Sequence, residues 1–106
     1  MITKRSKGLS ADELEQKILG GPLTFGEAVE SLRVRAETSQ VAFALKLGIS
    51  RQYLCDVEKG RRLVSPGQAA RFARAFGHPA PVLVQLALQD SVRASGLKLR
   101  VAVEAA

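Results

Sequence analysis

Arg51 and Gln52 are the side chains whose types and spacing best suit the recognition of a nucleic-acid base. An arginine guanidinium can donate two hydrogen bonds to O6 and N7 of guanine, and a glutamine amide can bond N6 and N7 of adenine. Asp56, one helical turn later, could accept from cytosine N4, orient Arg51 or repel wrong registers. Ser50 is a favoured helix cap, so the sequence predicts Arg51 and Gln52 on the first turn of a helix.

Further groups that can contact a phosphate backbone flank this pair. Lys59, Arg61 and Arg62 follow the helix and are expected to bind phosphates without reading sequence. Gln40 and Ser50 stand at the starts of two predicted helices, where backbone amides and the positive end of the helix dipole attract anions.

The charge distribution supports the same interpretation. The chain of 106 residues has a formal net charge of +6, and residues 40–74 hold seven basic side chains against two acidic ones, an excess of +5. Such a run is often only a solvated face. An excess of this size in one third of a chain nevertheless suits a polyanion such as nucleic acid.

Two short helical patterns separated by a glycine are expected to position the pair. Ser39 and Ser50 can cap these helices, and Gly48 can end the first in the left-handed conformation. Leu54 and Val57 would anchor the second helix from its buried side and leave its first turn facing outward. Two helices joined by a short, glycine-containing turn form a helix-turn-helix arrangement.

Helix starts are also predicted elsewhere in the chain. Ser10 and Thr24 each have a glutamate three residues later, the arrangement of a capping box, and the helix from Ser10 is expected to end at Leu19. Ser65 can cap another helix that begins with proline, and a last helix is expected after Pro81.

The final segment changes to a period of two. Leu97, Leu99, Val101 and Val103 alternate with polar or small residues, which predicts a half-buried strand. No other segment offers a convincing partner, and a lone strand leaves one edge of backbone groups unpaired. The same strand of a second subunit is therefore the expected partner, so these four residues are candidates for dimerisation. A disordered tail is the alternative.

The sequence predicts an all-α fold with three parts. Residues 1–22 would form a basic arm and a short extension helix, residues 23–93 the helix-turn-helix domain, and residues 94–106 a C-terminal strand that dimerises. No apolar run approaches the roughly 18 residues that a membrane span needs, and the basic N-terminus has no apolar stretch behind it. One cysteine fits a reducing compartment. We therefore expect a cytoplasmic protein without membrane contact.

The run SQxxFAxxLGISRQYLxxxEKGRR, residues 39–62, resembles the phage repressor and Cro-like helix-turn-helix domains known as the XRE family. The resemblance covers Leu23 to about Leu86. It implies a compact five-helix domain that binds operator DNA as a dimer.

The resemblance also implies roles for single residues. Gln40, which opens the first motif helix, would touch phosphate, and Arg51 and Gln52 would read bases. An arginine of the preceding helix often pairs with the motif glutamate, which here would join Arg33 to Glu58.

Other residues have less specific interpretations. Tyr53 could bond a phosphate, stack on a sugar or pack against the neighbouring helix. Cys55 and His78 are the only cysteine and histidine, and their spacing from the carboxylates indicates no metal site. No nucleophile stands beside a base and no phosphate loop is present, so neither an enzyme nor a cofactor is expected.

Two functions remain open at this stage. The first is a sequence-specific transcriptional regulator, a repressor that binds a palindromic operator as a homodimer. The second is an antitoxin that binds a cognate toxin and represses its own operon, since small repressor-like proteins with short extensions resemble such antitoxins.

Overall fold

The computed structural model describes residues 23–106. The extension helix expected at 10–19 and the basic arm fall within residues 1–22 and lie outside the described residues. The described part is all-α and has five helices: α2 (Phe25–Arg35), α3 (Gln40–Leu47), α4 (Arg51–Glu58), α5 (Pro66–Phe76) and α6 (Ala80–Ala94). None of these helices is long and apolar enough to cross a membrane.

Local hydrogen bonds confirm the predicted caps at the starts of α2, α3, α4 and α5, whereas α6 begins at Ala80, earlier than expected. The hydroxyls of Ser39, Ser50 and Ser65 each accept from the backbone N–H three residues later. Thr24 and Glu27 form a complete capping box at the start of α2. Gly48 ends α3 with φ 73°, in the left-handed region where a Cβ would be unfavourable.

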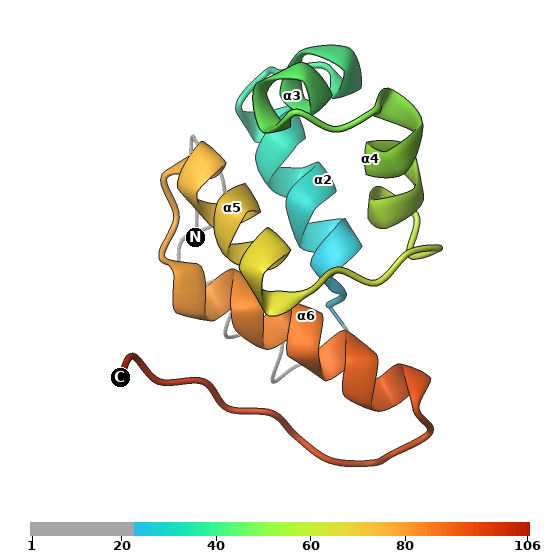
Figure 1. Cartoon of the computed structure of the whole chain (residues 1–106), viewed down its shortest axis with the longest axis vertical. Helices are drawn as coiled ribbons and strands as arrows, with labels where there is room; N and C mark the ends of the chain where they lie inside the picture. The colour runs from blue at the N-terminus through green and yellow to red at the C-terminus, as the bar shows by residue number, and fades with distance from the viewer. Residues whose placement is uncertain (1–22) are drawn as a thin grey trace, which may run out of the picture.

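One hydrophobic core joins all five helices, whose arrangement is drawn in Figure 1. Phe72 of α5 is fully buried at its centre, with its ring edge-on to both Phe25 and Phe43. Aromatic pairs in this geometry add to the free energy gained from area burial alone. Leu83 and Leu86 bring α6 into the same core, where α6 packs against α5 and α2.

The close approach of α2 to the end of α4 depends on Gly26. A Cβ at this position would collide with the backbone carbonyl oxygens of Val57 and Glu58. Only a residue without a side chain lets the two backbones lie this close. Gly26 thereby fixes where the last turn of α4 sits.

The C-terminal segment is extended rather than helical. Residues 97–106 form no β-strand with any described residue and run along α6, on the side of α6 away from α3 (Figure 1). The segment is held by side chains of α6, since Val101 and Val103 donate backbone hydrogen bonds to Gln89 and Gln85. The predicted β-strand is therefore not formed among the described residues, because the segment has glutamine side chains and no second strand beside it. Pairing with a second subunit stays a prediction.

Candidate nucleic-acid interface

α4 is anchored through its buried side and exposes its first turn. Leu54 and Val57 are buried to 0% and 1% exposure, whereas Arg51 and Gln52 are exposed. Ser50 caps the helix through the N–H of Tyr53. Arg51 makes no hydrogen bond or ion pair with the described residues, so its guanidinium is available to an external acceptor.

Gln52 is not free in the same way, because it belongs to a small polar network on α4. Its amide Nε2 donates to Asp56 Oδ1 at 3.0 Å. The same oxygen accepts from Nε and Nη2 of Arg61 at 3.1 and 2.9 Å. The hydrogen bond from Arg61 is the main cause that holds the pKa of Asp56 below its usual range, and the bond from Gln52 acts in the same direction. The contact partners of Asp56 are thus Gln52 and Arg61 and not Arg51, a relation that sequence spacing did not indicate.

Arg62 and Tyr53 form a second pair on this surface. The guanidinium carbon of Arg62 lies 4.8 Å from the centre of the Tyr53 ring, the geometry of a cation–π contact. Arg62 and Lys59 are both exposed, and Tyr53 is half-buried. The charged head of Arg62 therefore has a defined support next to the exposed face of α4.

A buried ion pair ties this helix to the two before it. Arg33 donates to Glu58 through Nε at 2.7 Å and through Nη2 at 3.1 Å, and Glu58 is buried. The hydrogen bond to Glu58 raises the pKa of Arg33. Gln40 also donates to Glu58, at 2.9 Å, so the start of α3, the end of α2 and the end of α4 meet at one carboxylate.

That arrangement changes what Gln40 can offer to a ligand. Its amide NH₂ group is directed at Glu58, so a phosphate contact would have to use the backbone N–H groups at the start of α3 instead. The main contact of the Gln40 side chain is thus a hydrogen bond that connects α3 to α4. The bidentate pair with Arg33 and this third bond satisfy a carboxylate that would otherwise be buried without compensation.

Two cations counted in the positive segment are engaged within the fold. Arg71 donates to the carbonyl of Leu47 at 2.6 Å, and Lys46 donates to the carbonyl of Ala75 at 3.0 Å. Both bonds satisfy carbonyl groups near helix ends that lack intrahelical partners. Arg61 is bonded to Asp56, so the charge available to an anion around α4 is carried by Arg51, Lys59 and Arg62, and Arg74 adds an exposed cation on α5.

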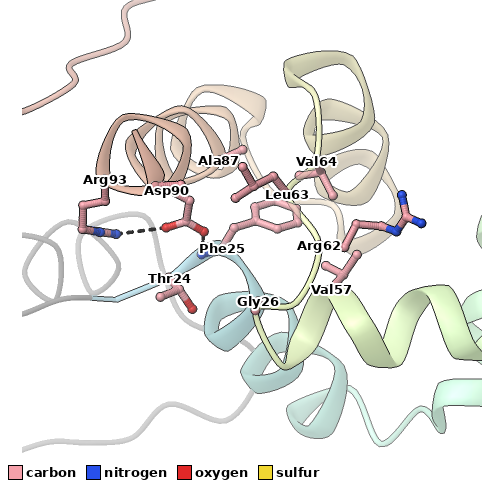
Figure 2. A pocket seen from close by; sticks show the side chains of 12 residues that line it. Thr24, Phe25, Gly26, Val57, Arg62, Leu63, Val64, Ala87, Asp90 and Arg93 are labelled. Carbon is pink, nitrogen blue, oxygen red and sulfur yellow. Dashed lines mark hydrogen bonds and ion pairs between the residues drawn. The ribbon is translucent and has the colours of Figure 1, made fainter. Parts of the chain in front are cut away.

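A hollow of about 200 Å³ lies behind the interface, between the start of α2, the end of α6 and residues 60–64 (Figure 2). Asp90 lines it and accepts from the Phe25 N–H at 3.0 Å and from Arg93 at 2.9 Å. Burial raises the pKa of Asp90. Because both polar contacts are already made within the fold, Asp90 serves to fix α2 on α6.

The described residues hold no group of three or more histidine, cysteine, aspartate or glutamate side chains that could bind a metal ion. Cys55 is a half-buried free thiol on α4.

Comparison with known proteins places this geometry in a family. A family model described as "Helix-turn-helix domain" matches residues 24–86, which include α2 to α5 and the first half of α6. Searches among curated proteins and among solved structures gave no significant match. The matched range contains every candidate base-reading and phosphate-binding residue.

Proposed function

We propose that this chain, which belongs to the helix-turn-helix domain family and is thereby a DNA-binding protein of transcriptional regulation, is a sequence-specific repressor that binds a palindromic operator as a homodimer. Domains of this family are typically not enzymes. The first turn of α4 enters the major groove, where Arg51 reads guanine and Gln52 reads adenine. The protein acts in the cytoplasm, and needs no cofactor.

The observation that carries this proposal is the state of Arg51. It is exposed on the first turn of a helix whose opposite side is fully buried, and it has no partner among the described residues. An exposed, unpartnered arginine on a rigid support can form a bidentate bond with a base without first breaking an internal bond.

The remaining candidates bind the backbone. Lys59, Arg61 and Arg62 lie at and after the end of α4, and the amides at the starts of α3 and α4 offer positive dipole ends to phosphates. These contacts fix the register on the duplex and do not select its sequence. Two such domains on one two-fold axis would read half-sites about 34 Å apart.

Selection of bound duplexes from a random DNA pool tests the proposal. The wild-type protein should enrich an inverted repeat, and Arg51→Ala should lose the preference at one base of each half-site, a discrimination of about 1–3 kcal/mol. Arg74→Ala removes the same charge from α5, outside α4 and outside the C-terminal segment, and serves as the control, with selectivity retained. Enrichment of no sequence over competitor DNA would end the proposal.

An antitoxin is the second candidate, and exposed apolar side chains on α3 favour it. Val41 and Leu45 lie one turn apart and are 61% and 80% exposed. Such side chains give a protein partner an apolar contact. Co-purification with the product of a small adjacent gene would support this function, and a gene that stands alone would count against it.

A further inference from the structure

The C-terminal segment is bonded to α6 along one edge of its backbone only. Gln89 accepts from the Val101 N–H at 2.8 Å and donates to the Leu99 carbonyl at 2.8 Å. Gln85 accepts from the Val103 N–H at 3.1 Å. In an extended chain, the N–H and C=O of one residue point to the same side, and those of the next residue point to the other side. The backbone groups of residues 99, 101 and 103 therefore face α6. There the side-chain amides of Gln85 and Gln89 take the place of a neighbouring strand.

The opposite edge of the segment is open. Residues 98, 100, 102 and 104 are all exposed, and their backbone groups bond to nothing among the described residues. The apolar side chains of Leu97 and Leu99 in the same segment are 51% and 61% exposed. An extended chain with one satisfied and one open edge is a template for a single further strand.

We propose that this edge pairs with its own copy as an antiparallel ribbon in the register centred on Val101. In that register Val101 faces the partner's Val101, Leu99 faces the partner's Val103, and Lys98 faces the partner's Glu104. The apolar residues then cover one another on one face, and two opposite-charge pairs form on the other. A two-fold axis through the centre makes both halves identical, as closed dimers require.

The backbone pattern is consistent with this register. In an antiparallel pair, residues whose backbone groups face the partner must lie opposite one another. The register centred on Val101 places Lys98 opposite the partner's Glu104 and Arg100 opposite the partner's Ala102, and all four belong to the open edge.

The neighbouring registers are less favourable. A register centred on Arg100 brings that residue opposite the partner's Arg100, and like charges directly opposite are destabilising. A register centred on Ala102 leaves Leu99 opposite the partner's Ala105, so less apolar surface is covered. A parallel pair in register would stack Lys98 and Arg100 on their own copies.

This inference rests on the homodimer of the proposed function and adds which atoms hold it together. It does not depend on DNA, because the paired segment lies on the side of α6 away from α3 (Figure 1). A failure here would leave base reading by Arg51 untouched, and a failure to bind DNA would leave the ribbon untouched.

Single cysteines in the full chain, with Cys55→Ser as background, measure the register directly. In the proposed ribbon Val101→Cys stands opposite its own copy, within the reach of a disulfide. The copies of Arg100→Cys or of Ala102→Cys would be offset by two residues, and their Cα atoms about 8 Å apart, beyond disulfide reach. Under oxidised glutathione, Val101→Cys should form a covalent dimer, and the other two variants should not.

If Arg100→Cys or Ala102→Cys formed the covalent dimer faster than Val101→Cys, another register would be assigned and the inference overturned. Sedimentation of the unmodified chain as a monomer at micromolar concentration would also overturn it. Charge reversal gives an independent measurement. Lys98→Glu and Glu104→Lys should each raise the dimer dissociation constant about tenfold, and the double variant should restore it. If the loss of dimerisation free energy in the double variant equalled the sum of the losses in the two single variants, the pairing would be contradicted.

Discussion

Arg61 and Asp56 are joined by two hydrogen bonds, from Nε at 3.1 Å and from Nη2 at 2.9 Å to the same carboxylate oxygen. The pair lies on the exposed side of α4, with Gln52 as a third member. A negative charge is thus held next to two residues that are proposed to contact DNA. Its physical effect is to neutralise Arg61 locally and to hold the amide of Gln52 in one orientation.

Asp56→Asn is expected to raise affinity for all DNA and to lower discrimination between sequences. Arg61 gains a free charge, so the logarithm of the binding constant should fall more steeply with salt, by about 0.9 for each added phosphate contact. Fluorescence anisotropy with specific and unrelated duplexes at several salt concentrations measures both quantities. Glu30→Gln on α2 makes the same charge change away from this network. Equal effects of the two variants would contradict the role assigned to Asp56.

Glu58→Ala is expected to destabilise the domain by about 3–5 kcal/mol, because it leaves the guanidinium of Arg33 and the amide of Gln40 without their acceptor. Urea unfolding followed by circular dichroism gives the free energy. The double variant Arg33→Met with Glu58→Met should lose less than the two single variants together, since no charge stays buried alone. A strictly additive loss would show that the pair is not coupled.

Gly26→Ala is expected to cost about 1–3 kcal/mol, because its Cβ meets backbone carbonyls of Val57 and Glu58, which cannot rotate away as a side chain would. Gly67→Ala on α5 is the matched control: its Cβ would meet only Ser65 Oγ, at 4.0 Å. That variant should gain about 0.5–1 kcal/mol from the higher helix propensity of alanine. Thermal unfolding of both variants distinguishes them, and an equal response would contradict the close approach of α2 to α4.

Asp90→Asn is expected to change how stability depends on pH. Burial raises the pKa of Asp90 in the folded state, so this group favours folding most below its unfolded pKa. Its contribution falls as the pH rises through the raised value. The asparagine cannot ionise and keeps an oxygen that can accept from the Phe25 N–H. Between about pH 3 and pH 7, the unfolding free energy of the variant relative to that of the wild type should therefore increase as the pH rises. A difference that does not vary with pH would contradict the raised pKa.

The caps illustrate what the sequence was able to predict. Ser39, Ser50 and Gly48 were expected at helix ends, and the structure confirms each. Such bonds join residues three or four positions apart, so residue order alone brings the partners together. The buried anchors Leu54 and Val57 followed in the same way from helical periodicity.

The positive segment shows where sequence analysis fell short. Its count of seven basic residues included Lys46 and Arg71, which cap helix ends within the fold. It also could not show that Asp56 bonds Arg61, or that Gln40 turns to Glu58. Composition counts charges, and only neighbours in space decide which of them stay available.

The sequence by itself thus determined the helices, their ends and the side chains that α4 exposes, because these follow from interactions within one or two helical turns. The tertiary structure alone decided which of those side chains are already engaged, and which edge of the C-terminal segment is left open. The physical reason is that these contacts join residues distant along the chain, such as Gln89 to Val101 or Gln40 to Glu58, whose meeting depends on how the helices pack.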